Sequence, residues 1–175
     1  MRYRQQFRRV VGIVGALMAL TGCAYTAAVK QLPPEERTAF RAYSKIMTSR
    51  QARTYLAQGT PAARAAYLEQ IGIAQRFQAL DPLDRTSVLN GYIRKGMSAD
   101  ALRFLWGEPY YTRGHTGHYE YWQYLGSAFD LADRGNSYTE GTVVIVYLVD
   151  DKVDWWFETI PTGIDKGGSE DRQRR

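Results

Sequence analysis

The chain has 175 residues, of which 45% are hydrophobic and 23% charged, and its formal net charge is +5. This length predicts one domain, with or without an appendage, and the composition is typical of a globular protein. The positive charge is concentrated at one end. Four arginines and no acidic residue precede Cys23, and the rest of the chain holds 19 basic and 18 acidic residues. The basic balance therefore indicates a targeting signal and argues against nucleic-acid binding.

The N-terminus has the pattern of a secretory signal. A basic stretch, Met1 to Arg9, precedes an apolar run of 11 residues, Val10 to Leu20. That run is too short to span a bilayer, where roughly 20 residues are needed. Leu20, Thr21 and Gly22 then lead to Cys23, the only cysteine. The alternative, an ordinary signal peptide with a chance cysteine, is disfavoured by the position, the spacing and the cysteine count.

Leu20-Thr21-Gly22-Cys23 closely resembles a bacterial lipobox. The resemblance implies a diacylglycerol thioether on Cys23, cleavage after Gly22 and acylation of the new amine, for example by palmitate. Two or three acyl chains anchor a protein stably where one would be marginal. In enteric lipoproteins an aspartate after the cysteine retains the protein in the inner membrane, so Ala24 implies an outer-membrane location. We expect residues 1–22 to be the cleaved signal peptide and 23–32 a lipidated tether.

Residues 33–80 are expected to form a helical segment of about three helices. Pro33-Pro34-Glu35-Glu36 begins the first, since proline and acids favour a first helical turn. Thr48 to Gln51 is a capping box for the second. Thr60-Pro61 begins a third, long helix. Asp81-Pro82 begins a fourth, in which Gly91 weakens the helix without ending it, so that Val88 pairs with Tyr92.

The stretch Lys95 to Pro109 predicts a short helix with a stop at each end. Gly96 breaks the preceding helix and Ser98 is a good N-cap. Gly107 can adopt the backbone conformation that closes the helix, and Pro109 prevents its continuation. We interpret the residues of this motif as architectural: Gly96, Met97, Ser98, Leu105, Gly107 and Pro109.

Three strands are predicted beyond this helix, over 119–125, 142–149 and 152–160, with a tight turn at Asp150-Asp151. Short connections favour an antiparallel meander. Residues 142–149 are apolar on both faces, which predicts that both faces of the sheet are covered. The helices around Gly96 can cover one face, and either the 33–80 helices or a partner protein must cover the other.

Gly96-Met97-Ser98 followed by Leu105-Trp106-Gly107-Glu108-Pro109 resembles the helix motif of the SmpA/OmlA (BamE-like) family of outer-membrane lipoproteins. The resemblance spans 81–161 and implies an α+β fold, a two-helix plus three-stranded antiparallel unit that follows the helical segment. It implies an accessory role in outer-membrane barrel assembly or envelope integrity, and contact with anionic lipid or a partner lipoprotein. The 126–141 connection is long for the family. We expect the tail, 162–175, to be disordered.

No catalytic constellation emerges. His118 and Glu120 would share a strand face and zinc binds such ligands, but no third ligand is close, so surface histidines are the preferred interpretation. Asp150, Asp151 and Asp154 fit a solvated turn better than a calcium site. We therefore expect no metal, no cofactor and no enzymatic activity.

Aromatic residues are the candidates for partner binding, because Tyr and Trp are favoured at interfaces. Core packing is the competing interpretation. The function predicted is an outer-membrane lipoprotein on the periplasmic face that binds envelope proteins. The alternatives are an inhibitor of an envelope enzyme, on a similarity to the β-lactamase-inhibitor-like fold, and a metal-dependent enzyme. The candidate contact residues are Tyr119, Tyr121, Trp122, Tyr124, Phe129, Trp155 and Trp156.

Overall fold

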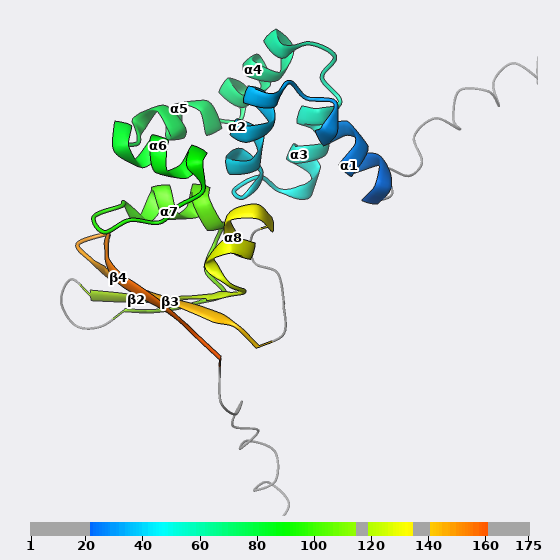
Figure 1. Ribbon diagram of the computed structural model, residues 1–175. Coiled ribbons are helices and arrows are strands. Elements are labelled where there is room, and N and C mark those ends of the chain that lie inside the picture. Colours follow the sequence, from blue (N-terminus) through cyan, green and yellow to red (C-terminus); the bar gives the residue numbers. More distant parts are fainter. Residues whose placement is uncertain (1–21, 115–118, 135–140, 161–175) are drawn as a thin grey trace, which may run out of the picture. The chain divides into compact units, whose positions relative to one another are not determined.

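The computed structural model describes residues 22–114, 119–134 and 141–160. The chain divides into two compact units, 1–33 and 34–175. In the first unit, α1 (Gly22–Lys30) occupies most of the predicted tether. The second unit is an α+β structure with several helices and a four-stranded antiparallel sheet (Figure 1). The predicted helical segment and the predicted sheet unit therefore lie within one compact body.

The predicted helix starts are confirmed at the residues that carry the capping signals. Thr48 and Gln51 form the capping box, and the side chains of Thr60 and Asp81 each accept a hydrogen bond from a first-turn amide. The helices are α2 (Pro34–Ser44), α3 (Ser49–Leu56), α4 (Pro61–Gln70), α5 (Ile73–Ala79) and α6 (Pro82–Asn90).

Two predicted helices are wrong in length, and a glycine with positive φ ends each of them early. The long helix expected after Thr60-Pro61 is split at Gly72 (φ 76°) into α4 and α5. The helix after Asp81 ends at Gly91 (φ 79°), where Gly91 N–H donates to Val88 and Tyr92 N–H donates to Ser87. This is a Schellman closure, which satisfies the last carbonyls and makes continuation unfavourable. The expected pairing of Val88 with Tyr92 within one helix is therefore wrong.

A buried ion pair connects the first helices. Glu36 of α2 accepts hydrogen bonds from Tyr55 of α3 and from Arg64 of α4, with O···O and N···O distances of 2.8 Å. The hydrogen bond from Arg64 is the main reason that the pKa of Glu36 lies below its usual value. Breaking such a pair leaves a poorly solvated charge, so the network holds the three helices in one arrangement.

The sheet has four strands in the order β1-β2-β3-β4, one more than predicted. The added strand, β1, pairs with β2 over its four residues. Asp150 and Asp151 form the expected turn between β3 and β4, both with positive φ. The long 126–141 connection contains a helix, α8 (Ala128–Arg134), with Leu131 fully buried. The strands are β1 (Tyr111–Gly114), β2 (Tyr119–Leu125), β3 (Val143–Val149) and β4 (Lys152–Thr159).

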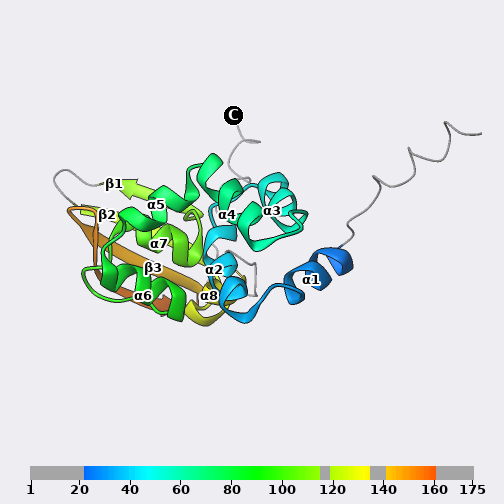
Figure 2. The same ribbon diagram turned by 90° about the horizontal axis from the view of Figure 1, so that it is seen from above.

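The helices of this unit all lie on one side of the sheet (Figures 1 and 2). α7 (Ala99–Trp106) lies next to the strands, and six of its eight residues are buried. On the face beneath it, Val144, Val146 and Leu148 have no exposed surface. Of the two alternatives for covering the second face, the 33–80 helices are excluded, because α2–α5 stack on the same side as α7.

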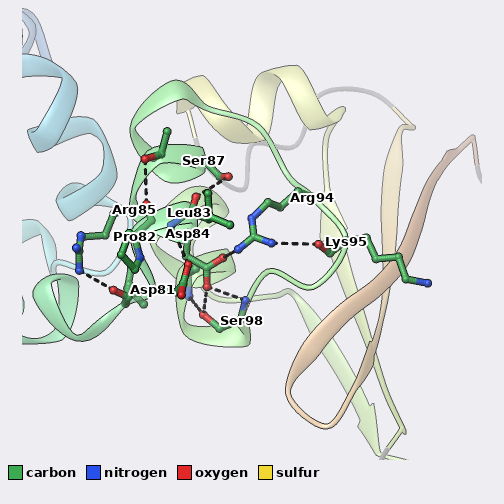
Figure 3. Close-up of polar contacts among 12 residues, drawn as sticks. Asp81, Pro82, Leu83, Asp84, Arg85, Ser87, Arg94, Lys95 and Ser98 are labelled. Atoms are coloured by element: carbon green, nitrogen blue, oxygen red, sulfur yellow. Dashed lines mark hydrogen bonds and ion pairs between the residues drawn. The ribbon is translucent and has the colours of Figure 1, made fainter.

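A buried carboxylate holds the beginning of α7 (Figure 3). Asp84 of α6 is 2% exposed, and it accepts hydrogen bonds from Ser98 N–H (3.0 Å) and Ser98 Oγ–H (2.8 Å). Ser98 Oγ in turn accepts from Ala101 N–H, as predicted for the N-cap. The guanidinium of Arg94 pairs with the other oxygen of Asp84. One side chain thus fixes the connection between α6 and α7.

The predicted motif around α7 has the architectural role expected of it. Met97 and Leu105 are buried, and Gly96 and Gly107 have positive φ. A Cβ on Gly107 would lie 3.3 Å from the carbonyl oxygen of Lys45, so the end of α7 approaches the residue that follows α2 where only glycine fits easily. The Lys45 amine donates to the carbonyl of Leu131 in α8 (3.0 Å), and burial lowers the pKa of this amine to about 8.

Substituting Asp84 tests this attachment. Asp84→Ala leaves the Arg94 charge and the Ser98 amide without their partner, and we expect a loss of about 3 kcal/mol of unfolding free energy. Asp81→Ala is the matched control, since Asp81 is an exposed N-cap worth about 1 kcal/mol. Urea unfolding of both variants measures the difference, and equal losses would contradict the role of Asp84.

Candidate functional site

The strongest candidate site is the face of the sheet that none of the helices in the described part of this unit covers. Alternation along each strand and the strand register assign its side chains. Tyr111, Tyr119 and Trp155 are 47%, 57% and 48% exposed, in contrast to the fully buried residues beneath α7. We call this surface the open face. It consists of Tyr111, Arg113, Tyr119, Tyr121, Gln123, Ile145, Tyr147, Val149, Trp155 and Phe157.

Aromatic rings form a continuous chain across all four strands of the open face. Tyr111 contacts Tyr121 (6.3 Å between ring centroids) and Tyr121 contacts Tyr147 (5.5 Å), both edge to face. Tyr147 stacks on Trp155 at 4.6 Å, and Trp155 stacks on Phe157 at 5.2 Å. Such cross-strand pairs stabilise a sheet. They also restrain the rings, so the surface is ordered before any partner binds it.

Polar groups on the open face are few. Burial raises the pKa of Tyr121, and the neighbouring Tyr147 and Tyr111 raise it further. The Tyr121 hydroxyl is therefore a neutral hydrogen-bond donor at neutral pH. Arg113 is exposed and lies in the same cross-strand row as Tyr121 and Tyr147. The surface thus combines an aromatic centre with one cation at the β1 edge.

The predicted contact residues separate into two groups. Tyr119, Tyr121 and Trp155 lie on the open face. Trp122 and Tyr124 do not, and their prediction as contact residues is wrong: they are 1% and 0% exposed and pack beneath α7. The Trp106 ring of α7 contacts Tyr124 at 5.3 Å, and the Arg103 guanidinium lies 4.6 Å from the Trp122 ring.

The other two predicted contact residues lie elsewhere. Trp156 pairs with Val146, so it belongs to the helix side of the sheet, where it is partly exposed. Phe129 lies on α8 and is 82% exposed. Neither is part of the open face.

Three aromatic residues of the open face were absent from the prediction: Tyr111, Tyr147 and Phe157. Phe157 was available from alternation, because it shares a strand face with Trp155. Tyr147 shares its strand face with no predicted contact residue, and the pairing of β3 with β2 places it opposite Tyr121. Tyr111 was not, since β1 has only four residues and no apolar alternation. β1 is a strand because it pairs with β2, and its own sequence does not predict one.

A pocket of about 550 Å³ on the helix side, with several charged residues in its lining, is the second candidate. It lies where α5, α6, α7 and β4 meet, and Asp84, Arg94 and Ser98 line it (Figure 3). Its charged groups neutralise one another, since Arg94 pairs with Asp84 and Arg76 with Asp100. These ion pairs hold the helices, and the pocket offers a ligand no excess charge of either sign.

The described residues do not support the metal-site alternative. His115 and His118 lie outside them. Glu120 accepts a hydrogen bond from the indole N–H of Trp122 (2.7 Å). Within residues 22–114, 119–134 and 141–160, no group of three or more potential metal ligands comes together.

Leu20 and Thr21 of the predicted signal peptide lie outside the described residues, as does the predicted tail 162–175, whereas Gly22 and Cys23 begin α1. None of the helices in the described part of the chain is long and apolar enough to cross a bilayer. In comparisons with known proteins, no family model, curated protein or solved structure matches the chain.

Fluorescence quenching tests the exposure of the open face. The chain has four tryptophans. Trp106 and Trp122 are each 1% exposed, while Trp155 is 48% exposed. We expect Trp155→Phe to remove most of the emission that acrylamide can quench. Trp122→Phe, the control, should remove emission that acrylamide does not reach. Similar losses of quenchable emission in the two variants would show that the open face is not accessible.

Proposed function

We propose that the chain is an outer-membrane lipoprotein that faces the periplasm and binds a protein partner through the open face of its sheet. The observation that supports partner binding most strongly is the ordered chain of aromatic rings on a face without covering helices. Apolar surface of this kind marks interaction sites. Tyr and Trp are also the residues most enriched where binding energy concentrates.

Membrane anchoring in this proposal rests on the sequence. A basic stretch, a short apolar run and Leu20-Thr21-Gly22-Cys23 supply the features of a lipoprotein signal. An acyl anchor on Cys23 would confine the folded unit to a thin layer next to the membrane. Confinement raises the effective concentration for any partner in the same membrane, so a modest surface suffices for stable binding.

The envelope role comes from the SmpA/OmlA (BamE-like) resemblance. The residues that carry the resemblance, Gly96, Ser98 and Gly107, lie at the two ends of α7, and antiparallel strands follow this helix. The chain would then be an accessory of outer-membrane assembly or envelope integrity, and it would act by binding rather than by catalysis. The folded unit could also touch anionic lipid.

A second candidate is an inhibitor or binder of an envelope enzyme. Phe129 favours it, because this large apolar side chain is 82% exposed on a helix whose Leu131 anchors it to the core. A protruding aromatic on a fixed helix is suited to filling a cleft. In that case the contacts would come from α8 and not from the sheet.

Site-specific crosslinking in intact cells tests the proposal. A photoreactive phenylalanine analogue at position 155 should crosslink to an envelope protein, because this position lies in the aromatic chain. Position 92 is the matched control, since Tyr92 is 49% exposed and lies between α6 and α7. Crosslinks from position 129 alone would support the enzyme-binding candidate instead.

The same experiment in the Cys23→Ser background tests the anchor. Without acylation we expect the protein to leave the membrane fraction, and the crosslink at position 155 to fall at least tenfold through the loss of confinement. If the Cys23→Ser variant stays in the membrane fraction, lipid anchoring is refuted. Equal crosslinking from positions 155 and 92 would refute the open face as the binding site.

A further inference from the structure

We infer that the open face accepts an amphipathic α-helix of the partner, with acidic residues beside its apolar stripe. This inference rests on the proposed function, because it specifies which kind of partner segment the aromatic chain binds. Three observations support it: the dimensions of the face, the way the opposite face is covered, and the position of Arg113.

The dimensions of the open face fit one helix. Four strands about 4.8 Å apart give a width of about 14 Å, and seven residues at about 3.3 Å each give a length of about 23 Å. A helix is about 10 Å in diameter, and 15 residues of it span about 22 Å. The face offers on the order of 300 Å², whereas a standard interface takes about 800 Å² from each partner. A partner helix meets the same limit, so its binding relies on the confinement proposed above. A second copy docked face to face is disfavoured by charge, because both copies would present Arg113 and Lys152.

The opposite face shows how this sheet is covered. There α7 lies over β2 and β3 and buries six residues against the sheet and the outer helices. A sheet packed by helices on both faces is a standard layer arrangement. A partner helix on the open face would complete it. The chain's own tail is a poor substitute, because Ile164 is the one large apolar residue in 161–175.

Arg113 determines the preferred charge of that helix. It lies in the row of Tyr121, Tyr147 and Trp155. At the far end Lys152 is exposed and pairs with Val149, so it adds a second cation on the same side of the sheet. A carboxylate flanking the apolar stripe would pair with Arg113 and accept from tyrosine hydroxyls, whereas a lysine would be repelled.

Two other occupants are possible outcomes of a test. A bilayer surface also attracts Tyr, Trp and Arg, but a twisted sheet is saddle-shaped and touches a plane over only part of its area. A strand would bind an edge of the sheet, β1 or β4, rather than lie across its face.

Designed peptides test the inference on the full-length lipoprotein in detergent. Two 16-residue helical peptides carry the same leucine stripe, flanked by glutamate in one and by lysine in the other. We expect the glutamate peptide to bind at least ten times more tightly, with a blue shift of the emission that Trp155→Phe abolishes. An eight-residue strand peptide with glutamates is one competing probe. The second is acrylamide quenching of Trp155 after the lipoprotein has been inserted through its anchor into vesicles of phosphatidylglycerol and phosphatidylethanolamine.

Charge reversal supplies the matched control. Arg113→Glu should weaken the glutamate peptide at least tenfold and strengthen the lysine peptide. Arg53→Glu makes the same change in net charge on α3, at an exposed position away from the sheet, and should alter neither affinity. Both substitutions are at exposed positions, and urea midpoints within the error of the wild type would verify folding.

The outcomes separate this inference from the proposed function. Equal or absent binding of the two helical peptides, tighter binding of the strand peptide, or protection of Trp155 from acrylamide by the vesicles overturns the helix inference. If position 155 still crosslinks to an envelope protein, the proposed function survives that result. If position 155 crosslinks to no protein, the proposed function is refuted, and the helix inference that rests on it is refuted as well.

Discussion

One helix, α7, shields one face of the sheet from water, and the rest of the unit is arranged to hold it there. At its beginning, Asp84 binds Ser98 and Arg94 at once. At its end, Gly107 allows the backbone to approach Lys45. Because both ends are attached to other parts of the helical layer, α7 cannot slide along the sheet without breaking a buried ion pair. The helical layer and the sheet therefore behave as one rigid support.

The other face of the sheet has no such cover from the helices of this unit. Its aromatic side chains protect each other by stacking, which explains why Tyr147 is only partly exposed although no helix packs on it. A rigid, half-solvated aromatic surface loses little entropy on binding. Next to the proposed lipid anchor, such a surface would need little area to hold a partner, since the anchor would confine the protein beforehand.

The sequence was sufficient where structure is local. The N-caps at Thr48, Thr60 and Ser98 were predictable because a hydroxyl before a helical run satisfies nearby amides. Gly72 and Gly91 were missed as helix ends. A glycine within a stretch of helical apolar periodicity ends the helix only when the residues after it pack against another part of the fold. Tertiary contacts determine whether they do.

The site was predictable only in part for the same reason. An aromatic-rich strand predicts a contact surface, but it does not specify which side the helices cover. Trp122 and Trp155 have similar chemistry, yet one is buried under α7 and the other lies on the open face. Even the formation of strand β1 depends on its pairing with β2. Only the register of all four strands assembles the aromatic chain.

Residue-level hydroxyl-radical footprinting tests the central claim most directly, by comparing the protein in native membranes with the purified protein. Tyr119 and Tyr92 have similar exposed fractions, 57% and 49%, and only Tyr119 lies on the open face. The account predicts that oxidation of Tyr119 and Trp155 falls severalfold in native membranes while oxidation of Tyr92 stays unchanged. Equal oxidation of the open face in both samples would show that nothing covers it, and would contradict the account.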